Sequence, residues 1–137
     1  MILWITGISG SGKTTLAKAF HKDFIKKHKS TIYLDGDEFR SLFGNDLKYT
    51  IKDRDINATR MTAFVKYISN QKINLIISAN ITSEKYRRWC RHNLKNFVQV
   101  YIKAKIESLI KRDYKKLYKR AINKRIKNVV GVDLPFN

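Results

Sequence analysis

The chain has 137 residues, of which 43% are hydrophobic, and its formal net charge is +18 at pH 7. This length suits one domain with a single core, and no run of residues is long and apolar enough to cross a membrane. The sole cysteine, Cys90, excludes an internal disulfide, and it indicates a reducing compartment, so we expect a cytoplasmic protein. The cationic excess is larger in residues 82–137 than in residues 1–81, and it favours polyanionic ligands such as nucleotides.

Short apolar runs alternate with longer amphipathic segments along the chain. Buried strands are predicted at Ile2–Ile5, Thr31–Leu34, Leu75–Ser78 and Val98–Ile102. Helices are predicted over Thr14–Lys27, Asp53–Asn70, Ser83–Asn93 and Lys105–Arg112. This alternation predicts an α/β domain in which a parallel sheet has helices on both faces. Ligands of such sheets bind beyond the carboxyl ends of the strands, so the segments that follow the strands are the candidates for a site.

Two of the predicted helices have apolar faces that indicate which residues enter the core. The first helix places Leu16, Ala19, Phe20 and Phe24 on one face. The second helix places Ile56, Met61, Phe64, Val65 and Ile68 on one face. We expect both faces to pack on the sheet.

A glycine-rich loop follows the first predicted strand. Residues 7 to 14 read Gly-Ile-Ser-Gly-Ser-Gly-Lys-Thr, which is the pattern of a phosphate-binding loop between a strand and a helix. Its glycines let backbone N–H groups approach a polyphosphate, and the next helix adds the positive end of its dipole. Lys13 can reach the terminal phosphates, and the Thr14 hydroxyl can bind Mg²⁺. The loop therefore predicts a bound nucleotide together with Mg²⁺.

Two carboxylates follow the second predicted strand, in the run Leu34-Asp35-Gly36-Asp37-Glu38-Phe39-Arg40. One carboxylate can hold Mg²⁺ through water, and the other can orient or deprotonate an attacking hydroxyl group. Arg40, about one helical turn beyond Asp37, can bind an anionic part of an acceptor. Asp37 is also a candidate N-cap for a helix that starts near Glu38, and that structural role does not exclude catalysis.

Two further polar segments carry candidate ligand-binding residues. In residues 49–60, Arg54 and Asn57 are three positions apart, so they share a helix face. Arg54 can pair with an acceptor phosphate, and Tyr49 can stack on a base, although this segment taken alone would be a solvated helix start. Residues 112–121 are rich in Lys and Tyr, which suits either a lid that closes over phosphates or a plain basic helix.

Together these segments resemble the adenylyl-sulfate kinase family over nearly the whole chain. The matching stretches are Gly7–Thr15, Leu34–Arg40, Tyr49–Arg60, Arg112–Ala121 and Gly131–Pro135. The resemblance implies a P-loop kinase that uses ATP and Mg²⁺ to phosphorylate the ribose 3′-hydroxyl of a nucleotide. In the family the acceptor is adenosine 5′-phosphosulfate.

The resemblance also implies roles for individual residues. Lys13 and Asp37 would be catalytic, with Asp37 facing the acceptor hydroxyl, and the metal would be held by Thr14 and Asp35. Tyr49 stands where the family usually has a Phe that stacks on the acceptor base. The implied ATP contacts are Gly7, Ser9, Gly10, Ser11, Gly12, Lys13, Thr14, Thr15 and Arg112. The implied acceptor contacts are Asp37, Arg40, Tyr49, Arg54, Asn57, Asn80, Ile81, Lys127 and Val129.

Two departures from the family pattern bear on the acceptor. The family's Ile-Ser-Pro after the third strand is replaced here by Asn80-Ile81-Thr82, and Val129 replaces a Phe that forms a second wall for the base. Loss of one stacking face would weaken purine binding by about 1–3 kcal/mol. A related branch, which looks like it serves capsule polysaccharide synthesis, phosphorylates cytidine diphosphoramidate. A smaller pyrimidine suits these replacements, so this nucleotide is the alternative acceptor.

The remaining expectations concern the extent of the domain and its partners. The resemblance implies that residues 1–137 form a single kinase domain without the C-terminal strand and helix of other members. The expected partner is a nucleotide acceptor, with no membrane association, and a homodimer is a further expectation. A kinase for RNA or DNA ends would suit the charge, but the sequence has no aromatic strand platform of the RNA-binding kind, so nucleic acid is not the expected partner. A nucleotide-binding module without catalytic activity is the third alternative.

Overall fold

A sheet of four parallel strands, in the order β2-β3-β1-β4, lies at the centre of the computed structural model, which describes residues 1–113 and 116–136. The strands are β1 (Ile2–Thr6), β2 (Thr31–Asp35), β3 (Asn74–Ser78) and β4 (Phe97–Tyr101). Trp4 of β1 lies opposite Ile77 of β3 and Gln99 of β4. All five residues of β1 are buried, because helices cover both faces of the sheet there, which explains the unbroken apolar run. The predicted strands are confirmed to within one residue at each end.

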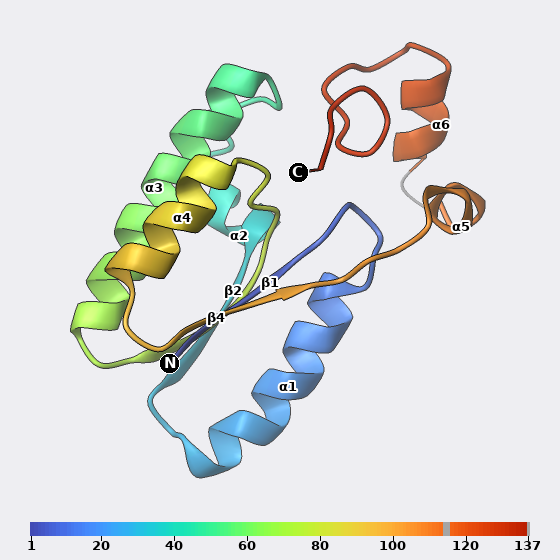
Figure 1. Cartoon of the computed structure of the whole chain (residues 1–137). Helices are drawn as coiled ribbons and strands as arrows, with labels where there is room; N and C mark the ends of the chain where they lie inside the picture. Colours follow the sequence, from blue (N-terminus) through green and yellow to red (C-terminus); the bar gives the residue numbers. More distant parts are fainter. Residues whose placement is uncertain (114–115, 137) are drawn as a thin grey trace.

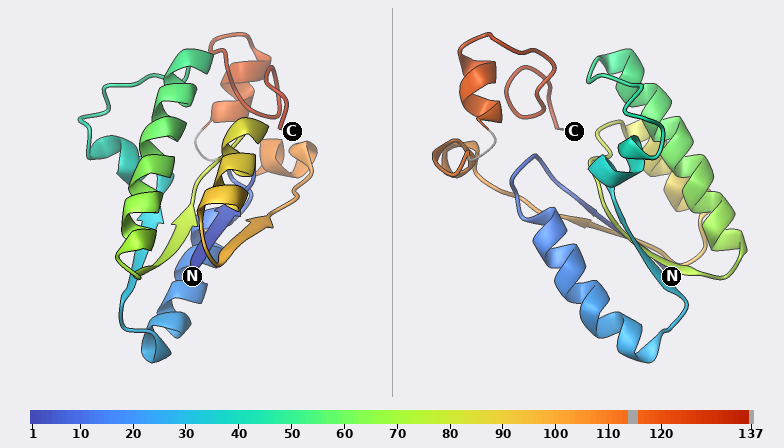
Figure 2. Two further views of the ribbon diagram at one scale, coloured as in Figure 1. Left: turned by 60° about the vertical axis from the view of Figure 1, so that its left-hand side comes forward. Right: turned by 180° about the vertical axis from the view of Figure 1, so that it is seen from behind.

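Helices lie on both faces of the sheet (Figure 1, Figure 2). α1 (Lys13–Lys27) covers one face, and α3 (Ile51–Asn70) and α4 (Glu84–Asn93) cover the other. The shorter helices are α2 (Gly36–Ser41), α5 (Ile106–Lys111) and α6 (Leu117–Ile122). The predicted α/β architecture is therefore confirmed. In the part of the chain that the structure describes, none of the helices combines the length and the hydrophobicity that a membrane crossing requires.

The main core lies between the sheet and the layer formed by α3 and α4. Trp4, Val65, Ile77 and Cys90 are each no more than 1% exposed in this core. The α3 residues Met61, Val65 and Ile68 are buried, as the apolar face of the predicted helix indicates. Burial raises the pKa of the Cys90 thiol to about 11, although the charge of Arg91 opposes this rise. Cys90 is therefore a structural thiol and not a nucleophile.

The face of α1 that meets the sheet differs from the prediction. Ala17 is fully buried, whereas Leu16 and Phe20 remain 46% and 38% exposed. Ala19 is exposed as well, so the expectation that Leu16, Ala19 and Phe20 enter the core is wrong. Phe24 does pack against the small core on this face of the sheet. The inward stripe instead runs through Ala17, His21 and Phe24, which have the i, i+4, i+7 spacing of one helix face. The polar His21 conceals this stripe in the sequence.

A second, smaller core lies beyond the carboxyl ends of the strands. It is formed by residues 106–113 and 116–136, which we call the C-terminal unit, together with Ile8 of the loop after β1. Its buried residues are Ile8, Leu109, Tyr118, Ala121, Val129 and Val130. Figure 1 shows this unit, in orange and red, at the end of the sheet where α3 begins. The unit therefore packs on the candidate phosphate loop and stands near the start of the helix that carries Arg54.

Candidate active site

The loop after β1 has the features of a phosphate-binding loop. Gly12 is the N-cap of α1 with φ of 97°, a left-handed conformation that glycine adopts without strain. Because glycine has no side chain, the first N–H groups of α1 are left to an anionic ligand. Ser11 Oγ is buried without a hydrogen-bond partner among the described residues, and Lys13 Nζ donates to the carbonyl of Ile8 at 2.9 Å. These residues fit the polyphosphate that the sequence predicts.

The carboxylate of Asp35 accepts hydrogen bonds from four groups at the carboxyl ends of the strands. Its Oδ2 accepts from the hydroxyls of Thr14 at 2.9 Å, Ser78 at 2.8 Å and Tyr33 at 3.1 Å. Its Oδ1 accepts from the backbone N–H of Asp37 at 2.9 Å. Burial favours the neutral acid, but the hydrogen bonds, that from Ser78 foremost, outweigh burial and lower the pKa of Asp35 from its ordinary value. Asp35 is thus held as a carboxylate.

Thr14 and Asp35 together fit the Mg²⁺ ion that the sequence predicts. Their side chains present a hydroxyl oxygen and a carboxylate oxygen 2.9 Å apart. Magnesium in phosphate sites takes oxygen donors of this kind, usually one or two carboxylates with the substrate phosphates. The contact also joins the phosphate loop to the end of β2. Sequence reasoning missed Tyr33 and Ser78, although Ser78 ends β3 and Tyr33 precedes Asp35 by two residues.

Asp37 lies at the start of α2, next to Asp35. The N-cap of α2 is Asp35, so the expectation that Asp37 caps a helix starting near Glu38 is wrong. Asp37 is exposed and donates its backbone N–H to Asp35 Oδ1, so the capping group is the carboxylate of Asp35. Gly36 makes this arrangement possible, because a Cβ there would lie 2.9 Å from Cβ of Ala79. The turn after β2 is therefore packed directly on the loop after β3.

Three predicted acceptor residues meet around one aromatic ring. The guanidinium carbons of Arg40 and Arg54 lie 4.7 Å and 5.4 Å from the ring centroid of Tyr49. Arg54 is partly buried, and this burial together with the charge of Arg40 lowers the pKa of its guanidinium. Arg54 also donates to two carbonyls, that of Tyr49 at 3.1 Å and that of Asn128 at 2.7 Å. Asn57 follows one helical turn beyond Arg54, where it is partly exposed.

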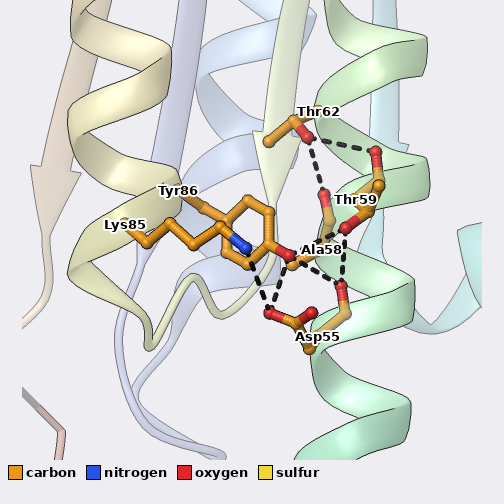
Figure 3. A network of polar contacts seen from close by, with 6 residues as sticks. All are labelled: Asp55, Ala58, Thr59, Thr62, Lys85 and Tyr86. Atoms are coloured by element: carbon orange, nitrogen blue, oxygen red, sulfur yellow. Dashed lines mark hydrogen bonds and ion pairs between the residues drawn. The ribbon is translucent and has the colours of Figure 1, made fainter.

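A network of hydrogen bonds fixes the beginning of α3 on α4 (Figure 3). Tyr86 of α4 is 5% exposed, and its hydroxyl lies 2.7 Å from Asp55 Oδ1 and 2.8 Å from Thr59 Oγ1. Asp55 and Thr59 share the α3 face that meets α4, since they are four residues apart. Lys85 lies 4.0 Å from Asp55 at the rim. The network therefore anchors the first turns of α3, which also carry Arg54.

The remaining predicted residues divide between the loop after β3 and the C-terminal unit. Asn80 is exposed, whereas Ile81 is 2% exposed and donates its N–H to Thr6 Oγ1 at 3.2 Å. Lys127 is exposed. Val129 is 5% exposed within the second core, so it supports the unit from inside.

Arg112 lies beside the phosphate loop. It lines a cavity of about 130 Å³ together with Ser9, Gly10, Leu109, Asp113, Leu117 and Tyr118. Tyr118 Oη donates to the carbonyl of Ser9 at 2.6 Å, a contact that the sequence did not reveal. The candidate lid therefore touches the loop through α6, while Tyr114 and Lys115 of the predicted lid segment lie outside the described residues.

Comparison with known proteins identifies the family of this chain. The model of the adenylylsulphate kinase family matches residues 1–137. A cytidine diphosphoramidate kinase of Campylobacter jejuni is 39% identical over 136 residues, which are 99% of this chain and 79% of that protein. An adenylyl-sulfate kinase of Clostridium acetobutylicum is also 39% identical, over 98% of this chain and 68% of its own length.

The solved structures agree with these sequence relationships. The APS kinase of Mycobacterium tuberculosis in complex with AMPPNP and APS is similar, with a TM-score of 0.87 and 25% identity. The match covers 99% of this chain and 81% of that one. The chain therefore belongs to the adenylylsulphate kinase family, and it is an ATP-dependent phosphotransferase that acts on a hydroxyl group of a nucleotide.

Proposed function

We propose that this kinase transfers the terminal phosphoryl group of ATP to the ribose 3′-hydroxyl of a nucleotide that carries a 5′ conjugate, with adenosine 5′-phosphosulfate as the first acceptor to test. The observation that carries the proposal is the hydrogen bond between Thr14 and Asp35. It brings the phosphate loop against the turn that bears Asp37. The cluster of Arg40, Tyr49 and Arg54 supplies cationic and aromatic groups for a second nucleotide.

On the ATP side, the chain supplies donors and a metal-binding pair. The first N–H groups of α1, Ser11 Oγ and the ammonium group of Lys13 would hold the phosphates. Thr14 and Asp35 would hold Mg²⁺, which supplies neutralisation of the charge on the transferred phosphoryl group. The lowered pKa of Asp35 keeps its carboxylate ionised for that task. Arg112 would cover the nucleotide from the C-terminal unit.

On the acceptor side, Asp37 would orient the 3′-hydroxyl and accept its proton as the oxygen attacks. Tyr49 would stack on the base, and Arg40 would bind the anionic 5′ group. Arg54 and Asn57 would add contacts from the first turns of α3. Because Arg54 already holds two carbonyls, part of its contribution would be to shape the site.

Cytidine diphosphoramidate is the second candidate acceptor. The support for it is the similarity to the Campylobacter jejuni cytidine diphosphoramidate kinase. The chain is 39% identical to that protein and spans 79% of its length. The burial of Val129 in the second core also leaves Tyr49 to carry the base, which suits a smaller pyrimidine.

A panel of acceptors tests the proposal directly. The purified chain is incubated with ATP, Mg²⁺ and either adenosine 5′-phosphosulfate or cytidine diphosphoramidate, and the 3′-phosphorylated product is detected by mass. Oligonucleotides with free 5′ ends serve as the nucleic-acid control. Product from a nucleotide acceptor supports the proposal, and product from the oligonucleotides alone overturns it.

A cytoplasmic location and a homodimer complete the proposal. Cys90 is the sole cysteine and is buried, so the chain forms no internal disulfide, as is usual for cytoplasmic proteins. Cell fractionation tests the location, and analytical ultracentrifugation tests the dimer.

A further inference from the structure

A single carboxylate organises the turn that faces Arg54. Asp133 Oδ2 accepts the backbone N–H of Asn128, and Oδ1 accepts that of Val129, both at 2.6 Å. Asn128 has φ of 64°, in the left-handed region that asparagine adopts more readily than most residues with a side chain. The N–H groups of Asp133 and Leu134 return to the carbonyl of Val129. The carboxylate of Asp133 therefore ties residues 128 and 129 to position 133 and fixes the conformation of this turn.

The same turn reaches the candidate acceptor site through one bond. The carbonyl of Asn128 accepts Arg54 Nη2 at 2.7 Å across 74 positions of sequence. The guanidinium groups of Arg54 and Arg40 both lie over the ring of Tyr49. Two like charges near one ring repel each other, and hydrogen bonds from Arg54 to carbonyl oxygens oppose this repulsion by holding its guanidinium in place. The Asn128 carbonyl gives the shorter of the two bonds, and Asp133 holds the turn that carries it.

The opposite charges of Asp133 and Arg54 also stabilise each other. Hydrogen bonds from Asn128 and Val129 lower the pKa of Asp133 although burial opposes them, and the charge of Arg54 adds to the lowering. Conversely, Asp133 favours the charged form of Arg54. The aspartate thus compensates part of the repulsion between the two arginines without forming an ion pair with either of them in the described contacts.

A second aspartate has the matching role at the other end of the C-terminal unit. Asp113 accepts the backbone N–H groups of Leu117 at 2.8 Å and Lys119 at 2.9 Å, at the start of α6. That helix carries Tyr118, whose hydroxyl donates to Ser9 of the phosphate loop. Asp113 therefore organises the part of the unit that faces ATP, whereas Asp133 organises the part that faces the acceptor.

We propose that Asp133 is a positioning residue for the acceptor nucleotide, which acts by holding the Asn128 carbonyl against Arg54. The inference rests on the proposed function, because it takes Arg54 and Tyr49 to border the acceptor. It assigns no chemical step to Asp133. It predicts that loss of the carboxylate weakens the use of the acceptor more than the use of ATP. The Asn128 carbonyl is hydrogen-bonded to Arg54, whereas the turn meets the phosphate loop only in the apolar packing of Ile8 with Val129 and Val130 among the described contacts.

The test compares Asp133→Asn with Asp113→Asn in the full chain. Initial rates are measured with ATP and whichever of adenosine 5′-phosphosulfate or cytidine diphosphoramidate the unchanged chain phosphorylates. Asp133→Asn is expected to raise the acceptor KM about tenfold, because it removes one charged hydrogen bond. The ATP KM is expected to change by less than about twofold. Asp113→Asn is expected to raise the ATP KM instead.

A double-variant cycle separates positioning from general loosening of the unit. If Asp133 acts through Arg54, the double variant should have an acceptor KM less than about twofold above that of the Arg54→Lys single variant. Full multiplication of the two effects overturns the inference, and so does an equal rise of both KM values in Asp133→Asn. Circular dichroism checks that each variant is folded. If Asp133→Asn is unfolded, Asp133→Glu, which keeps the charge, replaces it. The acceptor KM is again expected to rise without a matching rise in the ATP KM.

The outcome also distinguishes this inference from the proposed function. If the unchanged chain neither phosphorylates nor, by calorimetry, binds either nucleotide, the proposed function is overturned together with the inference. If it is active but Asp133→Asn leaves the acceptor KM unchanged, the inference alone is overturned.

Discussion

Thr14 Oγ1 lies 2.9 Å from Asp35 Oδ2, so one hydrogen bond joins the phosphate loop to the end of β2. Thr14 belongs to the first turn of α1, and Asp35 is the N-cap of α2. The two elements that carry the proposed ATP and acceptor residues are therefore fixed to each other through a pair of oxygens that also suits Mg²⁺.

The lowered pKa of Asp35 predicts a pH-dependent contribution to folding. A carboxylate with a folded pKa below its unfolded value stabilises the fold above the unfolded pKa, and it loses this contribution as pH falls through the folded pKa. Asp35→Asn should therefore lower the free energy of unfolding at neutral pH, and the difference from the unchanged chain should shrink below pH 3.8, the ordinary value. Urea denaturation across pH measures this difference, and a gap that is independent of pH would contradict the role of the charge.

Replacement of Lys13 by Ala should reduce phosphoryl transfer to a small residual rate. The ammonium group is the cation of the loop that can follow the terminal phosphates, and loss of one such electrostatic contact lowers kcat by about 100- to 1,000-fold. Steady-state rates with saturating ATP test this expectation. Lys22→Ala, an exposed position on the same helix, is the matched control and should retain activity. Near-normal rates for Lys13→Ala would refute the assigned role.

Asp37→Asn should separate ATP binding from transfer. The amide keeps the shape of the side chain but cannot accept a proton, so kcat should fall by at least about 100-fold. The affinity for ATP, measured by calorimetry, should stay nearly unchanged, because the phosphate loop and Asp35 are intact. Glu38→Gln removes the neighbouring exposed charge and serves as the control. A parallel loss of binding and transfer would show that Asp37 is a structural residue.

Much of the fold follows from local patterns, whereas several contacts of the site do not. The strand β1 is recognisable because burial on both faces of the sheet requires an unbroken apolar run. The turn and the helix after it are recognisable because an anion site at a helix N-terminus requires the glycine loop. The inward face of α1 was mispredicted because His21 occupies a position in it. The Tyr118–Ser9 bond spans 109 positions of sequence, and no local pattern predicts which distant carbonyl a tyrosine will reach.

The Tyr86 network predicts a measurable loss of stability. Tyr86→Phe removes the hydroxyl that joins Asp55 and Thr59, so the free energy of unfolding should fall by about 1–2 kcal/mol. Tyr67→Phe, on the exposed side of α3, is the matched control and should have almost no effect. Adding Thr59→Val to Tyr86→Phe should cost little more, since the shared bond is already absent. Equal losses for Tyr86→Phe and Tyr67→Phe would contradict the network.

The bond from Tyr118 to Ser9 predicts a selective effect on ATP. Burial, with the charge of Asp113 adding to it, raises the pKa of Tyr118 to about 12, so its hydroxyl stays protonated and donates at the pH of any ordinary kinase assay. Tyr118→Phe keeps the ring in the second core but removes the hydrogen bond to the Ser9 carbonyl. The ATP KM should therefore rise by about three- to tenfold, which corresponds to the free energy of one neutral hydrogen bond. The acceptor KM should change little, because the Asn128 turn is untouched. Tyr67→Phe again provides the control, and a rise of both KM values together would mean that Tyr118 acts only by stabilising the unit.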